Sequence, residues 1–164
     1  MARPTRTLEQ LLESSEHLYY EVWMFSVLVD GLESGIAGQG PIANALLESF
    51  VIHVRAIMDF LYADKPQQDD VIAEDFFSSP EGWTNIRPAL SKTLAQAKRR
   101  AGKEVVHLTY ARLKVTSETK PWRFVEIAKE VKTVMDAFLE NVPREQLGPI
   151  WRSGLFKKTL TRTQ

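Results

Sequence analysis

The chain has 164 residues, of which 44% are hydrophobic and 26% charged, the composition of one globular domain with its own core. It contains no cysteine, which excludes disulfide scaffolds, thiolate zinc sites, iron–sulfur clusters and cysteine nucleophiles. The first nine residues have no signal-peptide apolar stretch, and charges interrupt the apolar runs before they reach membrane-spanning length. We therefore expect an untargeted cytoplasmic protein without membrane contact.

Two long helices are predicted first in the chain. Apolar residues recur at steps of three and four from Leu8 to Leu32, and Thr7 with Gln10 has the spacing of a capping box, which predicts a helix over residues 7–34. Three glycines end this helix. Pro41 suits a first helical position and opens a second helix over 41–61.

Shorter elements are predicted in the middle of the chain. We expect Asp69 or Asp70 to cap a short helix through the two phenylalanines 76 and 77, and residues 78–82 to form a turn. The apolar positions from Leu90 to Leu108 then step by three or four residues, which predicts one helix, or two nearly collinear helices, over 88–108. Gly102 is the place where that helix would kink.

The last predicted helix covers 121–142, opened by Pro121 with Thr119 as its cap and ended by Pro143. A helical turn is expected around Ile150, Trp151 and Phe156. No segment alternates apolar and polar residues as a strand does. We predict an all-α fold: an antiparallel bundle of four main helices plus short helical pieces, forming a single domain over 1–164 in which 144–164 are a C-terminal extension.

The charge is zero only on average. Residues 7–86 carry a net charge of −12, whereas residues 87–164 carry +10. The densest basic stretch runs from Arg87 to Lys114, where eight basic residues face the single acid Glu104. Such a stretch fits a phosphate backbone. Alternatively, the acidic and basic helices are neighbours in the bundle, or across a dimer, and neutralise each other.

Two of the three histidines have structural interpretations. His17 lies one helical turn from both Glu13 and Glu21, the pattern of a solvent-facing histidine beside carboxylates, with metal binding as the minor alternative. His53 shares the apolar face of the second helix, which predicts a hydrogen-bonded core or interface histidine.

His107 carries the most information. It ends the chain's single Glu-x-x-His motif, begun by Glu104, whereas a dimetal carboxylate site needs two such motifs; we expect no metal and no cofactor. On a continuous helix, five polar residues would share one stripe away from the core, with Arg100 and His107 about 10 Å apart along the axis. These residues are Arg100, Lys103, His107, Tyr110 and Lys114. A solvated basic face explains the same pattern without chemistry.

Two segments, ESFVIHVRAIMDFLY at 48–62 and KEVVHLTYAR at 103–112, resemble the paired helices of HEPN-type bundles near abortive-infection proteins. In the ribonucleases of that family an Arg precedes a His by four to six intervening residues, and two pairs meet across a homodimer to cut RNA without a metal. Arg100 and His107 have six residues between them. Ala101 stands where the family usually has a polar residue, which is typical of members that have lost catalysis and serve as interaction modules.

Three functions follow. The first is a non-enzymatic or degenerate HEPN-like interaction module of a toxin, defence or stress system, a homodimer with an RNA or protein partner. The second is a metal-independent endoribonuclease in which His107 is the general acid or base and Arg100 stabilises the phosphate. The third is a ligand- or partner-binding bundle with a pocket around His53, Trp83 and Trp122. The candidate nucleic-acid contacts are Arg99, Lys103, Tyr110 and Lys114.

Overall fold

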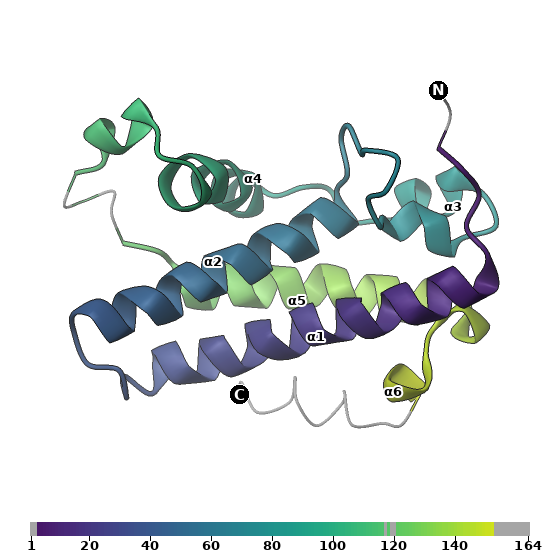
Figure 1. Ribbon diagram of the computed structural model, residues 1–164, viewed down its shortest axis with the longest axis horizontal. Helices are drawn as coiled ribbons and strands as arrows, with labels where there is room; N and C mark the ends of the chain where they lie inside the picture. Colours follow the sequence, from purple (N-terminus) through teal and green to yellow (C-terminus); the bar gives the residue numbers. More distant parts are fainter. Residues whose placement is uncertain (1–2, 117, 119–120, 153–164) are drawn as a thin grey trace.

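The computed structural model describes residues 3–116, 118 and 121–152, and all regular structure in these residues is helical (Figure 1). The predicted all-α class is confirmed. The elements in chain order are α1 (Leu8–Glu33), α2 (Pro41–Leu61), the 3-10 helix η1 (Ala73–Phe76), α3 (Pro80–Ile86), α4 (Lys92–Arg100), the π-helix η2 (Ala101–Val106), the 3-10 helix η3 (Tyr110–Lys114), α5 (Phe124–Asn141), the 3-10 helix η4 (Arg144–Gln146) and α6 (Pro149–Arg152).

The first two helices form an antiparallel hairpin, and both predicted ranges are confirmed. Thr7 caps α1 through the predicted capping box, with its Oγ1 accepting from the backbone N–H of Gln10 at 3.2 Å. The connection turns through glycines whose φ angles lie between 58° and 109°, a region that side-chain-bearing residues rarely adopt. Phe25 of α1 then stacks on Phe50 of α2, with ring centroids 5.6 Å apart.

The core lies between this hairpin and α5, and its centre is aromatic. Figure 1 shows α5 running alongside α1 and α2, with α4 drawn nearly end-on above them. Phe138 of α5 is fully buried and meets four other rings with centroids 5.1–6.0 Å away: Phe60, Phe76, Phe77 and Trp83. Edge-to-face pairs of this kind add stability beyond the buried area.

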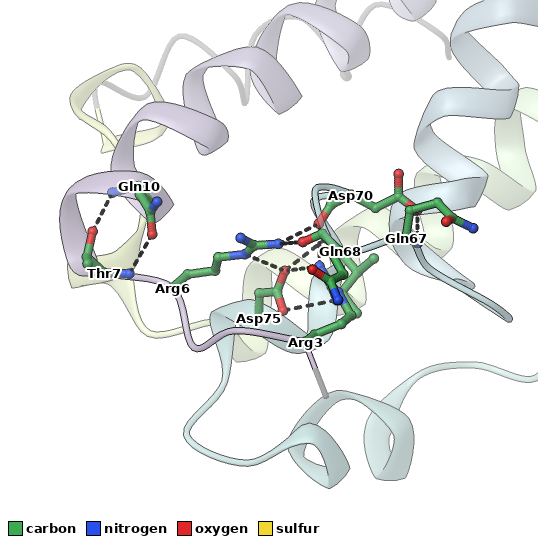
Figure 2. A network of polar contacts seen from close by, with 9 residues as sticks. Arg3, Arg6, Thr7, Gln10, Gln67, Gln68, Asp70 and Asp75 are labelled. Atoms are coloured by element: carbon green, nitrogen blue, oxygen red, sulfur yellow. Dashed lines mark hydrogen bonds and ion pairs between the residues drawn. The ribbon is translucent and has the colours of Figure 1, made fainter. Parts of the chain in front are cut away.

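The N-terminal residues before α1 clamp the segment after α2 (Figure 2). Arg3 donates to both carboxylate oxygens of Asp75, at 3.2 and 3.0 Å, and to the carbonyl of Asp70. Arg6 donates to the carbonyl of Gln68. Asp75 also accepts from the backbone N–H of Ile72, so one carboxylate holds both the arm and the start of η1.

The end of the described chain packs on α1. The indole Nε1 of Trp151 donates to the carbonyl of Ser15 at 2.6 Å, and the hydroxyl of Ser15 accepts from the N–H of Gly148 at 2.7 Å. Trp151 also meets Tyr19 edge-on at 5.4 Å. The helical turn expected around Ile150 and Trp151 is confirmed as α6, and Phe156 lies outside the described residues.

Three local predictions were wrong. Neither Asp69 nor Asp70 caps the short helix: Asp70 accepts from Gln67 N–H within its own loop, and Asp75 supplies the carboxylate at η1. The turn predicted over 78–82 ends at Ser79, because Pro80 starts α3. α5 begins at Phe124, three residues after Pro121, and the proposed cap Thr119 lies outside the described residues.

The helix predicted over 88–108 is shorter than expected. It begins at Lys92, where Ser91 caps it by accepting from Leu94 N–H at 3.0 Å, and it changes to a π-helix at Ala101. Leu90 and Leu108, predicted as core positions, are exposed, Leu108 to 90%. Leu90 lies before the helix begins and Leu108 after the π-helix ends, so the helical spacing holds neither of them on the buried face.

One helix in the described part of the chain, α2, is long and apolar enough to cross a membrane by length and composition, with a mean hydropathy of 1.2 over its most apolar stretch. Buried helices of ordinary bundles pass the same test. α2 packs against α1, α4 and α5, where its apolar residues form the middle of the core.

Candidate nucleic-acid interface

The segment from α4 to η3 changes conformation twice within a short length. α4 gives way to the π-helix η2, whose last hydrogen bond runs from the N–H of His107 to the carbonyl of Gly102 at 3.2 Å. His107 itself is extended, with φ −114° and ψ 141°. In Figure 1 the teal-to-green chain after α4 projects at the upper left, away from α1.

Hydrogen bonds back to the π-helix fix the course of this projecting segment. The hydroxyl of Thr109 donates to the carbonyl of Lys103 at 2.7 Å, and Nη2 of Arg112 donates to the carbonyl of Val105 at 3.0 Å. Gly102 faces the side chain of Arg55 on α2, and a Cβ there would lie 3.3 Å from Arg55 Nη1. The glycine therefore lets the π-helix approach α2 closely.

Arg100 is enclosed by neighbouring groups. Its Nε and Nη2 reach the carboxylate of Glu104 at 2.8–2.9 Å, and its guanidinium lies 4.2 Å over the ring of Trp122. Nη1 donates to the carbonyl of Pro121 at 3.3 Å, and the side chain is only 14% exposed. Arg100 thus joins the end of α4 to the entrance of α5, and the cation predicted to stabilise a phosphate already has a carboxylate partner.

His107 is exposed, as the sequence predicted, but not for the predicted reason. The shared stripe required a continuous helix through Gly102, whereas the chain leaves the helix before His107. The regular spacing between Arg100 and His107 is therefore lost. The place of the ring relative to the cations is set by the segment between η2 and η3 rather than by helix periodicity.

The remaining cations of this region are exposed and have no carboxylate partner within the part of the chain that the structure describes. Two of the seven basic residues between 92 and 114 form ion pairs, Lys98 with Asp59 at 2.9 Å and Arg100 with Glu104. The other five lie at the surface and make no ion pair with any described residue. We call this set the cationic surface: Lys92, Arg99, Lys103, Arg112 and Lys114.

The ion pairs and the cationic surface can be compared with the two explanations of the uneven charge, which are phosphate binding and neutralisation between acidic and basic helices. Neutralisation between acidic and basic helices of one chain accounts for Lys98, which bridges α4 to Asp59 of α2. It does not account for the cationic surface. A set of uncompensated cations on one stretch of chain attracts anions, most strongly at low salt.

Large exposed side chains lie among these cations. Tyr110 is 89% exposed, Leu108 90% and Leu113 82%, and each lies within four residues of a member of the cationic surface. Exposed aromatic rings between cations are typical of single-strand nucleic-acid binding, because bases stack on the ring while the cations contact phosphates. Of the candidate contacts named from sequence, Arg99, Lys103, Tyr110 and Lys114 are all exposed.

His53, Trp83 and Trp122, which were predicted to line one pocket, lie in different surroundings. His53 is buried and its Nδ1 donates to Glu21 at 2.7 Å, which confirms a hydrogen-bonded core histidine. Trp83 is fully buried and donates to the carbonyl of Leu61 at 2.9 Å. Trp122 stacks with Arg100.

Glu21 was assigned to the wrong histidine from the sequence. His17 is exposed as predicted, but Glu21 of the same helix pairs across the hairpin with His53. Within the described residues, no three histidine, aspartate or glutamate side chains are arranged to hold a metal ion.

Two residues that contact Arg100 were not predicted from the sequence to do so. Glu104 was treated as a lone acid in a basic run, although its spacing of four residues from Arg100 is that of a helical ion pair. Trp122 meets Arg100 from the non-helical chain before α5, and no local signal indicates such a contact.

The chain matches no protein-family model, and neither a curated protein nor a solved structure is similar to it at a significant level.

Proposed function

We propose that the protein is a non-enzymatic, HEPN-like interaction module that binds single-stranded RNA through the cationic surface. The observation that carries this proposal is the set of five exposed cations between Lys92 and Lys114 that have no carboxylate partner in residues 3–116, 118 and 121–152, with the exposed ring of Tyr110 among them. Each cation that contacts a phosphate releases a condensed counterion, which supplies sequence-independent affinity.

A single strand is favoured over a duplex by the residues between the cations. Tyr110 offers a flat surface on which an unpaired base stacks, with about 1–3 kcal/mol per stacked base. Bases of a duplex are already stacked on each other and leave nothing for that ring to bind. The aliphatic neighbours Leu108 and Leu113 extend the apolar contact.

Cleavage is not part of the proposal. Metal-free cleavage through the 2′-hydroxyl needs a proton carrier and a cation directed at the crowded phosphate. His107 is accessible, but Arg100 is bound by Glu104 and stacked on Trp122. Releasing it would cost both interactions. The contacts of Arg100 therefore favour binding without turnover.

The wider setting comes from the sequence resemblance. We propose the HEPN-type arrangement of four main antiparallel helices, a homodimer as the working form, and a role in a cytoplasmic toxin, defence or stress-response system. These proposals depend on the segments 48–62 and 103–112. Analytical ultracentrifugation of the pure protein measures the oligomeric state directly.

The experiment is RNA binding and RNA integrity measured on the same samples. A fluorescent single strand should bind the wild type reversibly and remain intact, with or without a chelator. A variant with Arg99→Ala, Lys103→Ala and Lys114→Ala should bind at least about tenfold more weakly, because each lost phosphate contact removes part of the electrostatic affinity. Lys129→Ala, an exposed cation of α5 without an ion pair to a described residue, is the matched control.

Two results would refute the proposal. One is unchanged affinity in the triple variant. The other is cleavage by the wild type that His107→Ala abolishes, which would establish the ribonuclease alternative instead.

A further inference from the structure

A pocket of about 400 Å³ lies beside the cationic surface and shares Arg112 with it. It lies between the N-terminal half of α2 and the η2–η3 segment. Its polar lining consists of Asn44, Glu48, Glu104, Arg112 and Trp122, and three aliphatic side chains complete it. Its volume is in the range of small-molecule sites, which combine apolar walls with a few directed polar groups.

Only some of these polar groups are free to bind a ligand. The carboxylate of Glu104 is occupied by Arg100. Glu48 is exposed and makes no hydrogen bond or ion pair with any described residue. Arg112 uses Nη2 to hold the carbonyl of Val105, which orients the guanidinium while its other N–H groups find no acceptor among the described residues. The pocket therefore presents one acceptor-only group, one donor-only group, an indole ring and, in Asn44, an amide that both donates and accepts.

That combination selects a flat heteroaromatic ligand with donors on one edge and acceptors on another. Guanine has two adjacent donors, N1–H and the N2 amino group, which match a carboxylate. It also has two adjacent acceptors, O6 and N7, which match an arginine. Adenine presents its amino group beside N7, so a donor would face the donors of the arginine. Cytosine offers the carboxylate only its amino group, and uracil offers it only one N–H.

We propose that this pocket binds a guanine base, with Glu48 accepting from its N1–H and N2–H groups, Arg112 donating to its O6 or N7, and Trp122 forming the apolar wall. The base belongs either to the bound RNA, which deepens the proposed function and rests on it, or to a free guanine nucleotide. Arg112 belongs to both the pocket and the cationic surface, so a base in the pocket would place its phosphates near the other cations.

The test compares two fluorescent single strands, one of uridines only and one with a single guanine among uridines, together with guanosine monophosphate measured by calorimetry. The guanine strand should bind about tenfold more tightly than the uridine strand, since a good bidentate contact is worth about 1–3 kcal/mol of base discrimination. Glu48→Gln should remove that preference and leave the uridine strand unaffected. Glu13→Gln, an exposed carboxylate of α1 without a described partner, is the control and should change neither value.

The outcomes separate the ligand sources and the two proposals. Binding of the free mononucleotide, lost in Glu48→Gln, supports the pocket and identifies a free nucleotide as sufficient. Guanine preference only within a strand supports the pocket as a base subsite of the RNA surface. Equal affinity for both strands with no mononucleotide binding overturns the pocket and leaves the RNA-binding proposal standing. Mononucleotide binding with no affinity for either strand overturns RNA binding and leaves the pocket.

Discussion

Replacing Arg100 by alanine should destabilise the protein without weakening RNA binding. The side chain is ion-paired with Glu104 at 2.8 Å, stacked 4.2 Å over Trp122 and 14% exposed. A helical ion pair four residues apart contributes about 0.3–0.5 kcal/mol and a cation–π contact about 0.5–1 kcal/mol. With the lost packing of the buried stem, we expect Arg100→Ala to lower the free energy of unfolding by about 1–2 kcal/mol.

Thermal and urea unfolding measure this loss. For a chain of this size, about 1–2 kcal/mol corresponds to a decrease in Tm of roughly 3–8 °C. The double-mutant cycle with Glu104→Gln should give a coupling energy of about 0.3–0.5 kcal/mol, because the two groups are in direct contact. The RNA affinity of Arg100→Ala should stay within about twofold of the wild type, whereas the unpaired Lys103→Ala should lose affinity and keep its Tm. The reverse pattern, an unchanged Tm with lost RNA binding or lost cleavage, would refute the structural role of Arg100.

Three further predictions concern the core, pH and the N-terminal arm. Phe138→Ala should lower the free energy of unfolding by about 3–5 kcal/mol, because it empties the centre of the aromatic cluster, with Phe138→Leu costing clearly less; equal losses would contradict that packing. Burial raises the pKa of Glu74 above its usual 4.5 despite Arg87 nearby, so the native state holds that proton more tightly than the unfolded state. The stabilising contribution of Glu74 is then complete below about pH 4.5 and is lost as the pH rises through the raised pKa. Glu74→Gln should make the free energy of unfolding, measured in urea, depend less on pH in this range. An unchanged dependence on pH would contradict the assignment. Arg3→Ala should speed amide hydrogen exchange in residues 67–76 at least several-fold, because Arg3 binds Asp75, and should leave exchange in α5 unchanged. Equal exchange rates of residues 67–76 in the variant and the wild type would show that the N-terminal arm does not stabilise this segment.

The long helices were predictable because their signals are local. The capping box at Thr7, the glycines after α1 and the proline at the start of α2 act on backbone within a few residues of themselves, so the sequence indicates both ends of each helix. Most core positions of α1, α2 and α5 follow from the periodicity of apolar residues in these helices. The aromatic cluster around Phe138 does not, because Phe76, Phe77 and Trp83 come from short segments outside the long helices.

The region after α4 was not predictable in the same way. Its apolar residues fit a helix through Leu108, but Gly102 packs against Arg55 of α2, and the chain adopts a π-helix there. That contact joins residues far apart in sequence, and periodicity carries no information about it. The role of Arg100 depends in part on Trp122, which lies in the non-helical chain before α5, so the candidate site was identified by its charge but not by its geometry.

The salt dependence of RNA binding tests the central claim most directly. If the five cations of the cationic surface each neutralise one phosphate of a single strand, log Kd should rise with log salt concentration with a slope of about 3.5, and each cation removed should lower that slope by about 0.7. A slope near zero, or one that the Arg99→Ala, Lys103→Ala and Lys114→Ala substitutions leave unchanged, would contradict RNA binding through this surface.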